Sequence, residues 1–237
     1  MTIRRVQLEP GFVLHQRAFR NTSQIIDCVT PHHGVVGLVA RGSRRPTSRL
    51  RSILQPFVPL RLSWQLKGEL GTLTGAEGSS HFSDLPPKGV LAGFYVNELV
   101  LSLMPREQAN EEAFSCYSQA LVDLAADPLL SRGVRLFEYR LLVALGYAPN
   151  LDHEVDSGRP VEPDVSYRFE TDRGPSRVPE STAPDTVWGR DLLSLHRCEL
   201  HDESSIGAAK RILSRALRSQ LGDRQLKSAA VLRQVVE

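Results

Sequence analysis

The sequence predicts an α+β protein in which a small closed β-barrel of five strands is followed by a mainly α-helical domain. Between residues 11 and 76, short runs alternate apolar and polar residues, the period of a half-buried strand, and turn-forming residues separate them. After residue 85 the apolar residues recur at helical spacing instead. We therefore expect a barrel domain over residues 1–80 and a helical domain over residues 81–237.

The barrel domain contains five predicted strands, and five short strands in about seventy residues suit a small closed barrel. Two prolines in the fourth strand confine that part of it to an edge or a bulge, because proline has no N–H to donate. The five ranges are Gly11 to Ala18, Gln24 to Thr30, Val35 to Ala40, Pro56 to Trp64 and Glu69 to Ala76.

The helical domain begins after the pair Pro86-Pro87 with a helix whose apolar stripe includes Leu91, Phe94 and Leu99, and Met104-Pro105 ends it. We expect this apolar stripe, and those of the helices that follow, to lie in the core. Further helices are predicted at Glu111 to Ala126, Leu129 to Leu145, Asp191 to Leu195, Ile206 to Leu221 and Lys227 to Val236. Ser204 or Ser205 is the expected N-cap of the helix at 206.

Residues 148–187 interrupt the helical pattern with six prolines and two glycines in a polar stretch. We interpret this segment as an irregular Pro-rich insertion with a short hairpin around Ser166 to Thr171.

Composition excludes several classes of protein. A chain with 41% apolar residues can bury a core without disulfides, and its three cysteines stand far apart with no CxxC among them, so no zinc site is expected. No run of apolar residues is long enough to span a membrane or to act as a secretion signal, which predicts a cytosolic protein.

Sequence motifs of the common enzyme classes are missing: the phosphate-binding loop, the dinucleotide-binding motif, HExxH and GxSxG. We therefore expect that the protein is not an enzyme. His32 and His33 are expected in a turn, and His153 in an acidic loop, rather than on a metal.

Charge is distributed unevenly although the net charge is only +2. Residues 41–67 hold seven basic residues and no acidic one, residues 84–191 hold 18 acidic and 10 basic residues, and residues 205–236 hold seven basic residues against Asp223 alone. Two basic segments therefore flank an acidic middle, and sign asymmetry of this kind suggests a polyanionic partner.

The run ARGSRRPTSRLRS places five arginines close to serine and glycine in a predicted turn. Arginine, unlike lysine, can hold a phosphate through two parallel hydrogen bonds, so the run is typical of a nucleic-acid contact. The alternative is a solvated loop that is cationic for solubility. Phe12, Phe19 and Trp64 are candidates for stacking on bases, although each is more typical of a core residue.

The residues leave two other functions open. An RNA-binding protein would share the basic loops but would prefer the ribose hydroxyl. A hydrolase could draw an acid and a base from the acidic middle, but its carboxylates show no clustered pair.

Several motifs resemble the bacterial recombination mediator family RecO. They occur in family order over nearly the whole chain: FVLHQRAFRNTSQIIDCVT, HGVVGLVARGSRR, LQPFVPL, GELGTL, GFYVNELVLSLM, RLFEYRLLVALGY and AAKRILSRALRSQLGDRQLKS. The resemblance implies an N-terminal OB-fold barrel followed by a helical domain, binding of single- and double-stranded DNA, and annealing of complementary strands. In some members the region matching residues 148–187 carries four zinc-holding cysteines, which are absent here, so no cofactor is expected.

The resemblance also implies partners. The protein would bind the acidic, phenylalanine-ending tail of single-stranded DNA-binding protein (SSB) and would act with RecR to load RecA onto SSB-coated strands. RecF is a further candidate partner. A cytoplasmic, nucleoid-associated location would follow. The candidate SSB-tail contact is Arg135, for which a surface salt bridge to Glu138, three residues on, is the alternative. The candidate DNA contacts are Arg17, Arg41, Arg44, Arg45, Arg49, Arg51, Lys210, Arg211 and Lys227.

Overall fold

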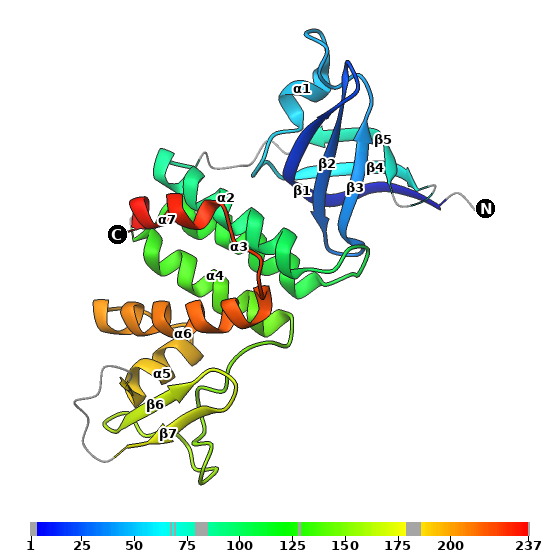
Figure 1. Cartoon of the computed structure of the whole chain (residues 1–237). Helices are drawn as coiled ribbons and strands as arrows, with labels where there is room; N and C mark the ends of the chain where they lie inside the picture. Colours follow the sequence, from blue (N-terminus) through cyan, green and yellow to red (C-terminus); the bar gives the residue numbers. More distant parts are fainter. Residues whose placement is uncertain are drawn as a thin grey trace. The chain divides into compact units, whose positions relative to one another are not determined.

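The structure, a computed structural model, describes residues 4–66, 68, 70–78, 85–127, 129–178 and 186–236 (Figure 1). The chain forms two compact units, one of Met1–Ala126 with Leu226–Val235 and one of Asp127–Gln225 with Val236–Glu237. Residues 85–126 thus group with the barrel, and the domain boundary at residue 80 stays a prediction. Glu69, the expected start of the fifth strand, lies outside the described residues, as do Lys67 of the basic stretch 41–67 and Pro179 and Pro184 of the Pro-rich stretch 148–187.

Five strands close the barrel of the first unit in the order β1-β2-β3-β5-β4. The long β1 pairs with β2 along one part and with β4 along another, and β3 meets β5 in parallel. Trp64, Leu62, Ile26, Leu38 and Val13 are buried inside. The strands are β1 (Arg4–Phe19), β2 (Ser23–Thr30), β3 (Gly34–Ala40), β4 (Leu60–Leu66) and β5 (Gly71–Gly78). The predicted five-stranded OB-type barrel is confirmed.

Two strand limits differ from the prediction by more than two residues. β1 begins at Arg4 rather than Gly11, because its first part pairs with β4 along a stretch that shows no clean alternation in the sequence. β4 begins at Leu60 rather than Pro56, and Pro56 makes only an isolated bridge to Val13. Proline cannot donate to a ladder, which accounts for the later start.

The helices of the first unit are α1 (Arg49–Ile53), α2 (Pro87–Leu103), α3 (Glu111–Ala126) and α7 (Ser228–Val236). Pro87 is the first residue of α2, where its fixed φ suits a helix start. Leu91 and Phe94 are 37% and 44% exposed, so the predicted burial of the whole α2 stripe is wrong. The buried face of α2 is formed by other residues, among them Tyr95 and Leu99, and the Phe94 ring packs edge-on against Phe57.

A buried polar network ties α2 and α3 to the barrel. The Asn97 amide donates to the Leu14 carbonyl oxygen (2.8 Å), and the Tyr117 hydroxyl donates to the Asn97 side-chain oxygen (2.7 Å). Burial raises the pKa of Tyr117, so its hydroxyl keeps the proton that it donates. The network holds the helices against β1 within this unit.

The second unit consists of α4 (Leu130–Ala144), α5 (Gly189–His196), α6 (Glu203–Leu221) and a sheet in the order β7-β6-β8. Its strands are β6 (Ser166–Glu170), β7 (Gly174–Arg177) and β8 (Thr186–Trp188). The expected hairpin is present, but the Pro-rich stretch ends in a third strand that sequence patterning missed because it is only three residues long. The N-cap of α6 is Asp202, not Ser204 or Ser205: Asp202 accepts from the Ser205 N–H (2.7 Å).

Candidate nucleic-acid interface

The arginine segment, Arg41 to Arg51, leaves β3 in a turn and then enters α1. The buried Ser43 hydroxyl donates to the Ala40 carbonyl (2.9 Å), the Arg45 N–H donates to the Gly42 carbonyl (3.2 Å), and the Ser48 N–H donates to the Arg45 carbonyl (3.0 Å). These hydrogen bonds, each between residues three apart, close successive turns of the backbone. The turn is as predicted, but Arg49 and Arg51 lie on the short helix α1, which is too short to show an apolar period in the sequence.

All five arginine side chains of this segment are exposed: Arg41, Arg44, Arg45, Arg49 and Arg51. No carboxylate among the described residues lies within 4.0 Å of their guanidinium nitrogens. Arg106 of the same unit differs, since its guanidinium donates to Asp27 at 2.8 Å. The positive charge of the arginine segment is therefore available to an external anion.

The segment is joined to the turn between β1 and β2, because the Arg44 N–H donates to the Thr22 carbonyl (2.9 Å). The exposed Arg20 lies at this turn with its guanidinium 5.1 Å from the centre of the Phe19 ring. Strand register places Arg17 opposite Ile25, which is opposite Val39, two residues before Arg41. Arg17 therefore lies on β1, two strands away from the end of β3 that leads into the segment. Arg20 is an additional exposed cation, which the sequence indicates only by its place beside Phe19.

Two of the three stacking candidates are core residues. Phe12 is 5% exposed and packs against Phe114 and Tyr117, and Trp64 is 2% exposed inside the barrel. Phe19 is half-buried and lies beneath Arg20. Of the predicted candidates, Phe19 is the one left at the surface.

The C-terminal basic residues divide between the units. Lys210 and Arg211 are exposed on α6 of the second unit, whereas Lys227 belongs to the first, immediately before α7. The Glu98 carboxylate accepts hydrogen bonds from the Lys227 and Ser228 N–H groups (2.9 and 2.8 Å). No single unit brings these three cations together.

Arg135 is buried in α4, with 8% of its side chain exposed, and its guanidinium lies 2.9 Å from the Glu138 carboxylate, which is fully buried. The ion pair with Glu138 is therefore present, as the spacing of three residues in a helix indicated. Its expected position at the surface is wrong, because α4 is buried along the face that carries both residues.

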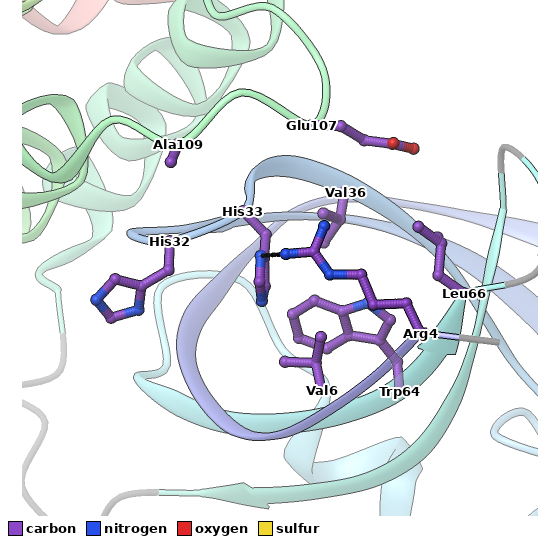
Figure 2. Close-up of a pocket in the computed structure, with 9 residues that line it drawn as sticks. All are labelled: Arg4, Val6, His32, His33, Val36, Trp64, Leu66, Glu107 and Ala109. Carbon is purple, nitrogen blue, oxygen red and sulfur yellow. Dashed lines mark hydrogen bonds between the residues drawn. The ribbon is translucent and has the colours of Figure 1, made fainter. Parts of the chain in front are cut away.

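A cavity of about 160 Å³ opens at one end of the barrel, between the β2–β3 turn and the start of β1 (Figure 2). Arg4 approaches the His33 ring (3.5 Å) above the Trp64 indole. Burial lowers the pKa of His33, which favours its neutral form. His32 donates its N–H to Glu9 (3.1 Å), so both histidines lie in the predicted turn.

Among the residues that the structure describes, the other titratable groups form no cluster with the geometry of a metal or thiolate site. Burial strongly raises the pKa of the Cys28 thiol, which disfavours the nucleophilic thiolate, and the three cysteines are free thiols. Within the described ranges, no three His, Cys, Asp or Glu side chains are placed to hold a metal ion. None of the helices described is both long and apolar enough to cross a membrane.

Comparison with known proteins assigns both parts of the chain. Residues 5–82 match the family model "Recombination protein O N terminal", and residues 87–230 match "Recombination protein O C terminal". The "DNA repair protein RecO" of Nitrosococcus oceani is 41% identical over 98% of this chain and 94% of its own length. The proteins of that name from Actinobacillus pleuropneumoniae and Haemophilus influenzae are 38% and 37% identical over 95% and 96% of the chain, and over 94% and 96% of their own lengths. The chain therefore belongs to the RecO family of DNA repair proteins.

Proposed function

We propose that this protein is a recombination mediator that binds single- and double-stranded DNA and anneals complementary strands. The observation that carries the proposal is the exposure of all five arginines of the arginine segment, none with a described carboxylate within 4.0 Å. Guanidinium groups in this state can replace the counterions of a phosphate backbone. Arg17 and Arg20 extend the charge along the adjoining turn.

Annealing follows from binding without any chemical step. Two complementary strands repel each other through their phosphates, and cations that cover phosphates on both strands lower this repulsion. Base pairing then supplies the free energy. No bond is made or broken, so the protein needs neither a nucleophile nor a metal for this activity.

We also infer that the protein acts on strands coated by SSB, binds the acidic tail of SSB, and with RecR helps to load RecA, with RecF as a further candidate partner. Membership of the RecO family supports this sequence of events. A protein that recognises SSB through its tail would be delivered to the strands that need repair.

Arg135 is the candidate contact for the SSB tail. Because its guanidinium already pairs with Glu138 inside α4, a tail carboxylate would have to share or replace that partner. A peptide with the tail sequence, compared with the same peptide lacking its final phenylalanine, tests the binding. We expect the shortened peptide to bind more weakly, and equal binding of the two would contradict tail recognition.

Annealing of two labelled complementary oligonucleotides tests the main proposal. The protein should accelerate duplex formation, and the variant Arg44→Ala/Arg45→Ala/Arg49→Ala should do so much less. Matched titrations with DNA and RNA of one sequence should favour DNA, and a preference for RNA would point to an RNA-binding protein instead. Prolonged incubation with Mg²⁺ should leave the DNA uncut, and cleavage would point to a hydrolase.

We infer further that bound zinc is not required. Residues 148–187 contain no cysteine, and the cysteines at 28, 116 and 198 are far apart in the sequence. A strong chelator should therefore leave annealing unchanged, and its loss on chelation, with recovery on adding Zn²⁺, would contradict this inference.

A further inference from the structure

The sheet of the second unit, in which β6 and β7 are labelled in Figure 1, has the order β7-β6-β8, and the residues of β6 and β8 alternate between buried and exposed. Tyr167, Phe169 and Val187 are buried on the inner face, and a small cavity lined by Phe169, Val187 and Ile212 of α6 lies against it. Arg168 and Trp188 alternate with these residues and are exposed on the outer face. The inner face of this sheet is therefore apolar, and its outer face presents an arginine and a tryptophan to solvent.

Strand register brings Arg168 and Trp188 together on that outer face. Ser166 pairs with Trp188 and Arg168 pairs with Thr186 across antiparallel β6 and β8, so Arg168 is the diagonal neighbour of Trp188. Diagonal neighbours are about 7–8 Å apart, within reach of long side chains. The Trp188 indole is 43% exposed, and the Arg190 guanidinium lies over it, 4.9 Å from the ring centre.

The backbone around Trp188 is held in place by the neighbouring loop. The Gly189 N–H donates to the Val165 carbonyl (2.8 Å), and the Arg190 N–H donates to the Pro163 carbonyl (2.9 Å). A Cβ at Gly189 would lie 1.9 Å from the Glu162 carbonyl oxygen, so only glycine permits this approach. Trp188 and Arg190 therefore project from a fixed backbone, which lowers the entropy lost on binding.

This surface carries the charges of Arg168 and Arg190, of which Arg190 also interacts with Asp191 and Asp202 at longer range. Among the described residues, no carboxylate lies within 4.0 Å of the Arg168 or Arg190 guanidinium nitrogens. Glu170, the acidic residue on β6, pairs with Arg173 at 3.5 Å. An exposed aromatic ring with two guanidinium groups beside it complements a base flanked by phosphates.

We propose that Arg168, Trp188 and Arg190, here called the Trp188 site, bind single-stranded DNA, with one unpaired base stacked on the exposed part of the indole and adjacent phosphates on the arginines. The inference rests on the proposed DNA-binding function and adds a second contact in the helical part of the chain. A duplex keeps its bases stacked inside, so the site should distinguish single-stranded from double-stranded DNA.

Tryptophan fluorescence gives a direct readout, because the chain has only two tryptophans and the other, Trp64, is buried in the barrel. Titration with an unlabelled single-stranded oligonucleotide should quench the emission of the wild-type protein. Trp188→Phe should bind with similar affinity, because phenylalanine still stacks, but should lose most of the quenching. Duplex DNA should quench neither protein.

Anisotropy of a labelled oligonucleotide measures the affinity. Trp188→Ala should bind single-stranded DNA roughly tenfold more weakly, the loss typical of removing one base–aromatic stack, and should bind duplex DNA as the wild type does. Tyr147→Ala removes another exposed aromatic side chain of the same unit, 49% exposed, and should change neither affinity. Arg168→Gln/Arg190→Gln should lower the salt slope of single-strand binding by about 1.4.

The outcomes separate the two proposals. If single-stranded DNA binds but the emission is unchanged and Trp188→Ala binds normally, the Trp188 site is wrong and the DNA-binding function stands. An equal loss for single- and double-stranded DNA in Trp188→Ala also overturns the site, because it would indicate a general structural effect. If the wild-type protein binds no DNA at all, the proposed function itself fails.

Discussion

Arg135 and Glu138 place an ion pair inside α4, where fewer than a tenth of either side chain is exposed. Desolvation of two charges offsets much of their attraction, so the pair as a whole adds little to stability. Removal of one partner is different, because the other charge then stays buried without it. The pair thus makes the protein sensitive to single substitutions and tolerant of a matched double one.

We predict that Arg135→Ala lowers the free energy of unfolding by about 3–5 kcal/mol, and that Arg135→Met/Glu138→Leu recovers most of that loss. Urea denaturation followed by circular dichroism measures both. Equal destabilisation in the single and double variants would contradict this account. The double variant is also the proper protein for the SSB-peptide experiment, since it should fold but lacks the guanidinium.

Asn97 is a second buried residue whose side chain is important for stability, because it hydrogen-bonds two other buried groups. A change of Asn97 to Ala leaves the Leu14 carbonyl and the Tyr117 hydroxyl without the partners described above. Unsatisfied buried groups of this kind cost about 1–3 kcal/mol each. We expect Asn97→Ala to destabilise the protein by at least about 2 kcal/mol in the same assay, whereas Asn21→Ala, at an exposed position in the turn between β1 and β2, should have a small effect.

At the scale of elements, α7 is attached to the first unit through Glu98 of α2. Burial alone would raise the pKa of Glu98, but hydrogen bonds from Ser228 and Lys227 outweigh it, and the pKa is lowered from its ordinary value of 4.5. A carboxyl whose pKa is lower in the folded state stabilises the protein above its ordinary pKa, and this contribution disappears as the pH falls through the lowered value. The attachment of α7 should therefore weaken in acid.

Hydrogen exchange of the α7 amides tests this attachment. Exchange, corrected for its intrinsic pH dependence, should accelerate below the lowered pKa of Glu98, and Glu98→Ala should show the faster exchange already at neutral pH. Glu112→Ala removes an exposed carboxylate from α3 and should leave α7 protected. Unchanged protection of α7 in Glu98→Ala would show that other contacts hold it.

Helices and strands with a strong apolar period could be predicted from the sequence. Very short elements, and strand limits that depend on pairing with a distant strand, could not. The limits of α3 agree with the prediction to the residue, because its stripe is regular and both ends carry clear signals. α1 and β8 are too short to show a period, and the first part of β1 depends on pairing with β4, a contact between distant residues.

The candidate site shows the same division. Clustering in sequence indicated the five arginines, since a turn without carboxylates leaves their side chains exposed. Burial of Arg135 depends on which face of α4 meets the core, and local composition does not determine that. The Trp188 site required strand register and backbone contacts to be recognised.

At the scale of the whole molecule, the protein carries its positive charge at both ends of the sequence and its negative charge between them. The arginine segment and Arg17 lie in the first unit, and Lys210 and Arg211 lie in the second. A strand that contacts both units would be bound at several separate points. This distribution suits a protein that holds a flexible single strand rather than one that reads a fixed duplex sequence.

The central claim is that the arginine segment binds DNA phosphates, and the salt dependence of single-strand affinity tests it most directly. Each phosphate contact adds about 0.7 to the slope of log affinity against log salt concentration, so Arg44→Ala/Arg45→Ala/Arg49→Ala should lower that slope by about 2 and weaken binding. Arg5→Ala/Arg159→Ala/Arg197→Ala removes the same charge from exposed positions outside both proposed DNA contacts and should keep the wild-type slope. A wild-type affinity and slope in the first variant would contradict the claim.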